Sequence, residues 1–275
     1  MSTASPIPAD ARIVGILGGM GPLATADLMT KIILNTPAAC DQDHVPVVLA
    51  SLPRMPSRID AIVSGGPSPL PLMLDSLRRL ERAGAGLIAM PCNTAHHWHP
   101  ALAGHTRLPL LHIVDCTLGE LTASERRIGL LGSAGTRRMR LYSDPLRARG
   151  LTPVEPAADE QARWVDPAID DVKAGRIAVA ALRLERAAQA LADRGADVVV
   201  LACTELPIAM SGVRWTRGVR LLDATAALAR ACVAWHRAGG RDDRADPVPA
   251  PDAAAQAAPD VVARAVPDAF TLTAG

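Results

Sequence analysis

The chain has 275 residues, a formal net charge of +1 and 49% hydrophobic residues, enough for one large α/β domain or two smaller ones. The near-neutral charge and the scarcity of aromatic residues (four Trp, one Tyr and one Phe) argue against a nucleic-acid partner. No apolar run reaches the roughly 18 residues of a membrane span, and Met1 to Arg12 do not resemble a secretion signal. Five scattered cysteines do not form a disulfide framework, so we expect free thiols and a cytoplasmic location.

Short apolar runs alternate along the chain with longer segments of helical periodicity, which predicts βαβ units and a mostly parallel sheet. Apart from His112, each run is apolar throughout, as expected for a strand covered on both faces. The predicted strands are Ile13–Leu17, Val45–Ala50, Leu87–Met90, Leu108–Val114, Ile128–Leu131, Val198–Ala202 and Val219–Leu222. Apolar residues at spacings of three and four predict a helix over 70–80 that ends at Gly84, and another over 177–191 that ends at Gly195.

An internal repeat divides the chain into two parts. Three features recur in the same order, at offsets of 114, 111 and 108 residues. They are two glycines separated by two apolar residues, a glycine eight residues before a cysteine, and an aspartate two residues before a threonine. The matched segments are Gly15–Gly18 with Gly129–Gly132, Gly84–Cys92 with Gly195–Cys203, and Asp115 with Asp223. Chance explains one such match, whereas three in order predict two similar three-layer α/β lobes related by a pseudo-two-fold axis.

The repeat sets the expected domain boundaries. The first lobe spans 1–115 and is completed by about 222–238, and the second lobe spans 116–221. Residues 240–275 contain 11 alanines, six aspartates and five prolines with few large apolar side chains. Such a composition buries too little surface to offset chain entropy, so we expect a low-complexity, disordered tail.

Cys92 and Cys203 each follow a predicted strand directly and precede a helix. In open α/β sheets this position faces the ligand crevice, and nearby backbone N–H groups and the helix dipole favour the thiolate. Either cysteine alone is more simply interpreted as a small buried side chain. Because the position is duplicated, we expect two facing lobes to bring both sulfurs to opposite sides of one cleft.

Two opposed thiols suit the inversion of a carbon that carries a weakly acidic hydrogen. One group removes the proton and the other delivers a proton from the far face, and similar groups let the reaction run both ways. Cys40, Cys116 and Cys232 lack this placement, so we interpret them as structural.

Four motifs together resemble the aspartate racemase branch of the aspartate/glutamate racemase superfamily, and the resemblance covers about residues 12–236. The motifs are Gly18–Thr25 (GGMGPLAT), Asp41–His44 (DQDH), Met90–His96 (MPCNTAH) and Cys203–Pro207 (CTELP). Glutamate racemases typically have Thr-His and an aromatic residue after the second cysteine, so the last motif favours the aspartate branch. The resemblance implies a racemase that interconverts L- and D-aspartate without PLP or any other cofactor. It also implies that Cys92 and Cys203 are the two bases and that the protein forms a homodimer.

The resemblance also implies residues that bind the substrate. Arg58 matches an arginine that holds a carboxylate, although Ser57 stands where the family commonly has aspartate, and Lys173 matches a lysine near the distal carboxylate. The glycine turn around Met20 would bring backbone N–H groups to a carboxylate. The other residues that match family contacts are Asn93, Thr94, Thr136, Thr204 and Glu205.

Several alternatives stay open from the residues alone. Cys92 with His96, His97 and His99 superficially suggests zinc, but the chain has no second ligand pair at zinc-like spacing. The glycine turn lacks the spacing of a phosphate-binding loop, so we predict neither metal nor cofactor. A broad aspartate/glutamate racemase, a hydantoin racemase or a maleate isomerase could use a similar cleft. A catalytically silent, two-lobed amino-acid sensor is the alternative outside the enzymes.

Overall fold

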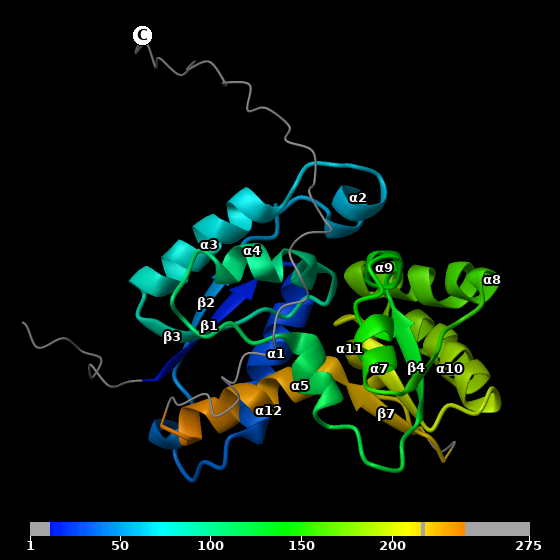
Figure 1. Ribbon diagram of the computed structural model, residues 1–275. Coiled ribbons are helices and arrows are strands. Elements are labelled where there is room, and N and C mark those ends of the chain that lie inside the picture. The colour runs from blue at the N-terminus through cyan, green and yellow to red at the C-terminus, as the bar shows by residue number, and fades with distance from the viewer. Residues whose placement is uncertain (1–11, 216–217, 240–275) are drawn as a thin grey trace, which may run out of the picture. The chain divides into compact units, whose positions relative to one another are not determined.

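The computed structural model describes residues 12–215 and 218–239, and the predicted tail at 240–275 lies outside the described residues (Figure 1). Its first sheet has three parallel strands in the order β2-β1-β3. These strands are β1 (Ile13–Gly18), β2 (Val47–Ser51) and β3 (Ala85–Ala89). All six residues of β1 are buried, as expected for the central strand of a sheet with helices on its faces.

Six helices and two 3-10 turns belong to this part of the chain or join it to the next. They are α1 (Pro22–Asn35), η1 (Asp41–Asp43), α2 (Arg58–Val63), α3 (Leu70–Arg82), η2 (Thr94–Trp98), α4 (His99–Ala103), α5 (Ile113–Leu118) and, from the end of the chain, α12 (Ala224–Arg237). The predicted helix over 70–80 corresponds to α3. It buries Met73, Leu77 and Leu80, and Gly84 follows it with a φ of 85°, the left-handed conformation that glycine adopts without strain.

The second sheet has four parallel strands in the order β5-β4-β6-β7. The strands are β4 (Arg127–Gly132), β5 (Thr152–Val154), β6 (Val198–Ala202) and β7 (Arg220–Asp223). Its helices are α6 (Ala134–Arg138), α7 (Ser143–Ala148), α8 (Ala158–Glu160), the π-helical turn η3 (Gln161–Val165), α9 (Asp166–Lys173), α10 (Ile177–Asp193) and α11 (Leu206–Met210). The fold class predicted from the sequence, two α/β lobes with parallel sheets, is confirmed.

The two sheets match each other strand by strand. β1, β2 and β3 correspond in order and pairing to β4, β5 and β6. The prediction of a strand over 108–114 was wrong. In the second sheet β7 lies beside β6, but at the equivalent place beside β3 the described residues form only a single bridge, between Ile88 and Leu110. The chain then begins α5 at Ile113. The sequence analysis also missed β5, an edge strand of three residues that contains a proline.

The last helix, α12, returns to the first sheet. It packs against α1 and α5, and Asp223, at the end of β7, caps it by accepting hydrogen bonds from the backbone N–H groups of Thr225 and Ala226. Lys31 of α1 lies 2.6 Å from the Asp223 carboxylate and 2.5 Å from Asp27. One hydrophobic core therefore runs from the first sheet through α12 into the second.

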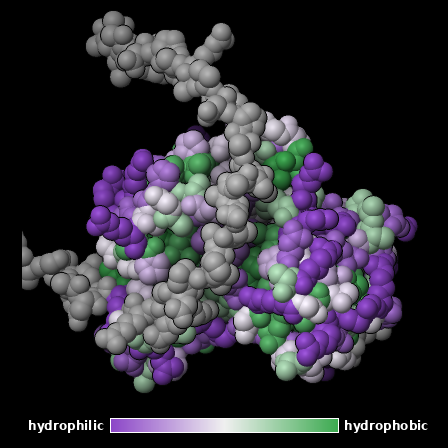
Figure 2. Space-filling view, viewed as in Figure 1, coloured by the Kyte–Doolittle hydropathy of each residue, from purple (hydrophilic) through white to green (hydrophobic). Residues whose placement is uncertain are grey.

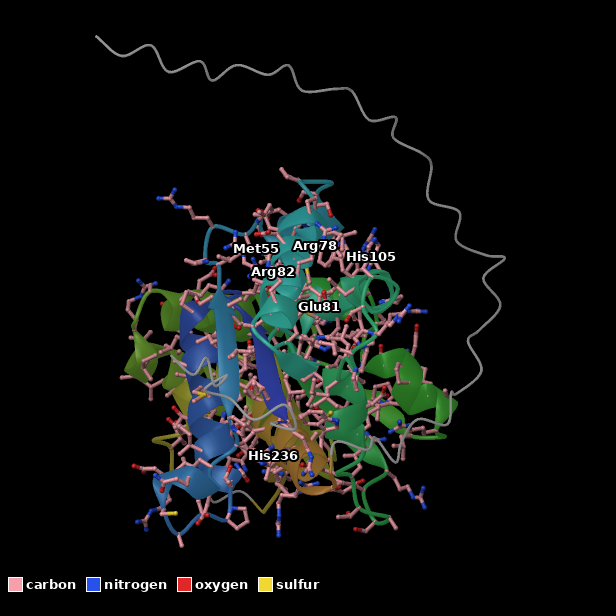
Figure 3. The ribbon with its side chains drawn as sticks, turned by 90° about the vertical axis from the view of Figure 1, so that its left-hand side faces the viewer. Met55, Arg78, Glu81, Arg82, His105 and His236 are labelled. Atoms are coloured by element: carbon pink, nitrogen blue, oxygen red, sulfur yellow. The ribbon has the colours of Figure 1, made fainter. Side chains whose placement is uncertain are left out.

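The far end of α12 is fixed to the start of β1. His236 and Arg12 exchange two hydrogen bonds, in which the Arg12 guanidinium donates to the His236 carbonyl at 2.7 Å and the His236 ring lies 3.0 Å from the Arg12 carbonyl. Figure 3 shows His236 on α12, at the opposite end of the first lobe from Arg78, Glu81 and Arg82 on α3. Both ends of α12 are thus held by polar contacts.

Polar side chains cover most of the outer surface around α8 and α10 in the view of Figure 2. Within the described ranges, no helix combines the length and the apolar character that crossing a membrane requires.

Candidate active site

A small pocket lies where the two lobes meet, and side chains of both lobes line it. Its volume is about 50 Å³, far below the roughly 300–1,000 Å³ of pockets that bury drug-sized ligands. The lining residues are Met20, Ser57, Arg58, Ile59, Cys92, Asn93, Thr94, Ser133, Ile169, Lys173, Cys203, Thr204 and Glu205. Nine of the ten residues predicted for the site are among them, and Thr136 is not.

Cys92 and Cys203 both line this pocket, from different lobes. Cys203 follows the last residue of β6, and Cys92 lies three residues beyond β3, so both lie at the carboxyl ends of parallel strands, where ligands bind in open α/β sheets. Each residue is 6% exposed and each thiol is free. The structure therefore brings together the two cysteines that the repeat singles out.

Cys203 is held in its protonated form. Its thiol donates a hydrogen bond to the Glu205 carboxylate at 3.0 Å, and the Thr204 hydroxyl donates to the same oxygen at 3.4 Å. Burial raises the pKa of the Cys203 thiol well above its usual value, and the negative charge of Glu205 raises it further. At neutral pH the Cys203 thiol therefore carries its proton.

Cys92 meets a different charge. Burial raises the pKa of its thiol as well, but the Arg58 guanidinium lowers it by favouring the thiolate. The expected contribution of helix dipoles is outweighed, because η2 and α11 have only five residues each and burial dominates at both thiols. Arg58 makes Cys92 the easier thiol to deprotonate.

Arg58 is the first residue of α2, and Ser57 caps that helix by accepting a hydrogen bond from the backbone N–H of Asp60. Serine and aspartate are both good N-caps, so the serine at this position preserves the start of the helix. The Arg58 Nη1 donates to the Pro56 carbonyl at 3.0 Å. Its Nε is buried, and the described residues offer it no acceptor. A carboxylate in the pocket would supply one.

Lys173 ends α9 and reaches the pocket from the second lobe. Its side chain is 46% exposed and lies 3.4 Å from Asp170. The turn after α9 is fixed by the buried Asp171, which accepts a hydrogen bond from Arg176 at 2.7 Å and lies 3.0 Å from Arg183 of α10. The backbone around Lys173 is therefore well held while its ammonium group keeps the freedom to reach a ligand.

The glycine turn brings Met20 to the pocket. Gly19 has a φ of 91°, and a Cβ there would lie 2.4 Å from the backbone nitrogen of Leu52, so the chain requires glycine at this position. The Gly19 N–H donates to the Thr25 hydroxyl at 2.9 Å, which in turn donates to the Gly21 carbonyl.

The described part of the chain contains no group of three or more His, Cys, Asp or Glu side chains that could hold a metal ion.

A family model described as Asp/Glu/Hydantoin racemase matches residues 17–232. The chain belongs to this racemase family. The broad specificity amino-acid racemase RacX of Bacillus subtilis is 26% identical over 230 residues, which are 82% of this chain and 99% of RacX. The structure of Picrophilus torridus aspartate racemase is 31% identical, with a TM-score of 0.73 over 83% of this chain and 94% of that one. A glutamate racemase from Francisella tularensis, 14% identical with a TM-score of 0.61, shares the fold.

In this racemase, which is an isomerase, Asn93 is held by Tyr142, a residue that the sequence analysis missed. Tyr142 donates a hydrogen bond from its hydroxyl to the Asn93 Oδ1 at 2.5 Å. The Asn93 Nδ2 is buried and finds no acceptor among the residues described. Tyr142 therefore fixes the amide with its donor free for a ligand. Tyr142 lies 49 residues from Asn93 in sequence, and no motif marks it.

Ser133 is the second residue that sequence reasoning missed. Its hydroxyl lies 2.8 Å from the Thr94 hydroxyl of the other lobe and 3.1 Å from that of Thr136. Thr94 and Thr136 lie 3.3 Å apart, so the three hydroxyls form a triangle between the lobes of the racemase. Thr136, which was predicted for the site, belongs to this triangle but does not line the pocket. Ser133, which was not predicted, does line it. Ser133 follows the repeated Gly132, which is a signal that could have found it.

Proposed function

We propose that the racemase interconverts L- and D-aspartate by two-base proton transfer at Cα, with Cys92 and Cys203 as the bases and without PLP or another cofactor. The observation that carries the proposal is that two buried cysteines from equivalent places in the two lobes line one pocket. A thiol on each side of a bound amino acid can remove the Cα proton from one face and return a proton to the other.

The charges around the two thiols give the proposed order of events. Cys92, beside Arg58, is the thiol that ionises more easily, and as the thiolate it takes the Cα proton, leaving a carbanion-like intermediate. Cys203 donates its thiol proton to the opposite face of Cα. Cys92 ends as the thiol and Cys203 as the thiolate, so the reverse reaction starts from the mirror arrangement. Burial makes each thiolate a stronger base, because a desolvated anion gains more by taking a proton.

The substrate class follows from the charges that line the pocket. Arg58 and Lys173 are the cations and Glu205 is the carboxylate. Aspartate carries the complementary set, two carboxylates and one ammonium group, so each charge finds an opposite partner. The donors left free on Arg58 and Asn93 favour the α-carboxylate at that end of the pocket, where they would stabilise the charge of the intermediate.

A broader amino-acid racemase is the second candidate. The likeness to the broad specificity racemase RacX extends over nearly the whole of that protein, and the partly exposed Lys173 leaves the distal end of the pocket adaptable. Glutamate would meet the same charges as aspartate with one more methylene group between them. A hydantoin racemase, a maleate isomerase and a non-catalytic amino-acid sensor remain alternatives for the same test.

The test is hydrogen exchange in deuterated water with a panel of aspartate, glutamate, neutral and basic amino acids, a hydantoin and maleate. We expect L-aspartate to yield D-aspartate labelled with deuterium at Cα, measured by chiral chromatography and mass spectrometry. Faster labelling of several unrelated amino acids would favour the broad racemase. Binding that raises the melting temperature without any exchange would indicate the sensor.

Single variants of the two cysteines test the mechanism. Cys92→Ala and Cys203→Ala should each abolish racemisation, because one face of the substrate then lacks its proton carrier. Exchange of one enantiomer at Cα can survive through the remaining thiol. Cys40→Ala, which changes an exposed cysteine outside the pocket, is the matched control and should keep full activity. Full racemisation by either pocket variant would contradict the two-base mechanism.

We also propose that the racemase acts as a homodimer, as the family resemblance implies. Six of the eight large apolar side chains that are exposed in the described structure belong to the first lobe. They are Leu23, Ile33, Leu34, Leu49, Val63 and Leu72. The first lobe thus exposes more large apolar side chains than the second, three of them on α1, and exposed apolar surface is typical of a contact with another protein chain, so we expect the interface on the first lobe.

A further inference from the structure

Three histidine rings pack together behind Cys92. His96 lies in η2, His99 begins α4, and His112 precedes α5. The His112 ring lies edge-on to the other two, with centroids 4.8 Å from His96 and 4.7 Å from His99, and His96 and His99 stack at 5.8 Å. None of the three lines the pocket, yet His96 is 2% exposed and contacts the catalytic segment directly.

The hydrogen bonds of His96 fix its tautomer. The backbone N–H of Ile113 can only donate, and it does so to the His96 Nε2 at 3.1 Å. The Nε2 therefore carries no hydrogen, and the ring hydrogen lies on Nδ1. Nδ1 is 2.9 Å from the carbonyl oxygen of Cys92 and donates to it. Only the neutral ring with its hydrogen on Nδ1 makes both bonds.

The bond to the Cys92 carbonyl replaces a bond that the backbone does not make. In an α-helix the backbone N–H of His96 would donate to the residue four positions earlier, which is Cys92. Here η2 is a 3-10 turn, and that N–H donates to Asn93 at 3.0 Å. The imidazole reaches back to the Cys92 carbonyl in its place. The same ring holds Ile113, so it joins the cysteine segment to the start of α5.

We propose that His96 is a positioning residue for Cys92, in that its Nδ1–H holds the Cys92 carbonyl and thereby the direction of the thiol. The inference rests on the proposed function in taking Cys92 as a base. Proton transfer from carbon is sensitive to small displacements of the base, so a loose carbonyl would slow the chemical step without greatly weakening substrate binding. His99, whose Nε2 donates to the Leu110 carbonyl at 3.0 Å, supports the packing of the cluster and does not touch Cys92.

Two amide variants separate the bonds of His96. In His96→Asn the amide nitrogen takes the place of Nδ1 and keeps the donor to Cys92, while the bond to Ile113 is lost. In His96→Gln the amide oxygen takes the place of Nε2 and keeps the bond to Ile113, while the donor to Cys92 is lost. We expect kcat to stay within about threefold of the wild type for His96→Asn, and to fall about tenfold or more for His96→Gln with KM within about twofold.

The opposite order would overturn the proposal. If His96 served only to fill space, Gln, which is closer to His in size, would be the milder change. His99→Gln is the matched control, since the amide nitrogen can still donate to Leu110, and it should keep the wild-type kcat.

A second readout needs no substrate, which separates this inference from the proposed function. The rate of alkylation by iodoacetamide, resolved for each cysteine by mass spectrometry, should change at Cys92 in His96→Gln and stay unchanged at Cys203. Nitrogen NMR of the wild type should find the His96 hydrogen on Nδ1. Finding it on Nε2, or finding equal alkylation of Cys92 in all variants, would overturn the role of His96, whereas a wild type without racemisation would overturn the proposed function.

Discussion

Cys92 and Cys203 occupy equivalent places in the repeat but face different charges. Arg58 lies near Cys92 and favours its thiolate, whereas Glu205 accepts the hydrogen of the Cys203 thiol. Two thiols with identical surroundings would ionise equally easily. Burial raises the pKa of both thiols, but that of Cys203 is raised further, so Cys92 is the thiol that loses its proton first as the pH rises.

Glu205→Gln tests this asymmetry. Removing the negative charge lowers the pKa of the Cys203 thiol, because the charge of Glu205 and its hydrogen bond both stabilise the protonated form. The pH profile of Cys203 alkylation should therefore move to lower pH, while that of Cys92 moves less. Asp170→Asn, which neutralises an exposed carboxylate, is the control and should leave the profile of Cys203 unchanged. An unchanged profile in Glu205→Gln would show that Glu205 does not hold the proton.

The cysteines could be predicted from the sequence because each follows a buried strand at the same offset from a glycine, and that placement is local information. Tyr142 and Ser133 could not be predicted in the same way. Tyr142 reaches Asn93 across 49 residues, and Ser133 reaches Thr94 across 39. Their roles depend on how the lobes pack, which no single segment records. The raised pKa values of both thiols likewise follow from burial in the folded protein.

At the level of elements, the segments η2, α4 and α5 meet at the histidine cluster. Burial lowers the pKa of all three histidines, and lowers that of His112 to about 4. Two titratable neighbours also act on the pKa of His112: His99 lowers it and Asp115 raises it. Asp115 lies 3.8 Å from both His112 and Arg149. The cluster therefore joins these elements only while its rings are neutral.

This arrangement predicts a loss of stability at mildly acidic pH. The unfolded chain takes up protons on these histidines below about pH 6.5, whereas the folded chain resists them down to about pH 4 at His112. Stability is therefore complete above pH 6.5 and falls as the pH drops through this window, by about 3 kcal/mol for His112. Urea unfolding of the wild type and of His112→Asn between pH 7.5 and 4.5 measures this change in the free energy of unfolding. The variant should lose less stability on acidification, while the exposed His105→Asn should follow the wild type.

The elements also show where sequence patterns fail. The segment over 108–114, predicted to be a strand, is apolar apart from His112. Only Leu110 bridges to β3, and the last two residues of the segment begin α5. An apolar run of that length does not by itself distinguish a strand from the buried start of a helix. The helices α3 and α10 could be predicted because their apolar stripes run over three turns or more and glycine follows each.

On the scale of the whole molecule, the two lobes share one core through α12, while their exposed surfaces differ. Large apolar side chains are exposed mainly on the first lobe, Leu34 most of all at 76%. If that surface forms the dimer interface, Leu34→Glu should weaken the dimer, because a charge there loses its water on association. Light scattering after size-exclusion chromatography should give twice the monomer mass for the wild type and a lower average for the variant.

Leu182→Glu is the matched control for this prediction. Leu182 is 65% exposed on α10 of the second lobe, so the same substitution there should leave the dimer intact. A wild type that stays monomeric at all concentrations would contradict the dimer. A dimer that Leu182→Glu weakens and Leu34→Glu does not would place the interface on the second lobe.

The hydroxyl triangle of Thr94, Ser133 and Thr136 makes one of the contacts between the two lobes polar. Thr94 and Ser133 also line the pocket of about 50 Å³, so the triangle lies directly beside it. Three hydroxyls can exchange their mutual hydrogen bonds for bonds to water, so separating them costs little free energy. Apolar side chains at the same place would lose favourable burial if the lobes separated. The contact between the lobes beside the pocket is therefore easier to separate than an apolar contact of the same size.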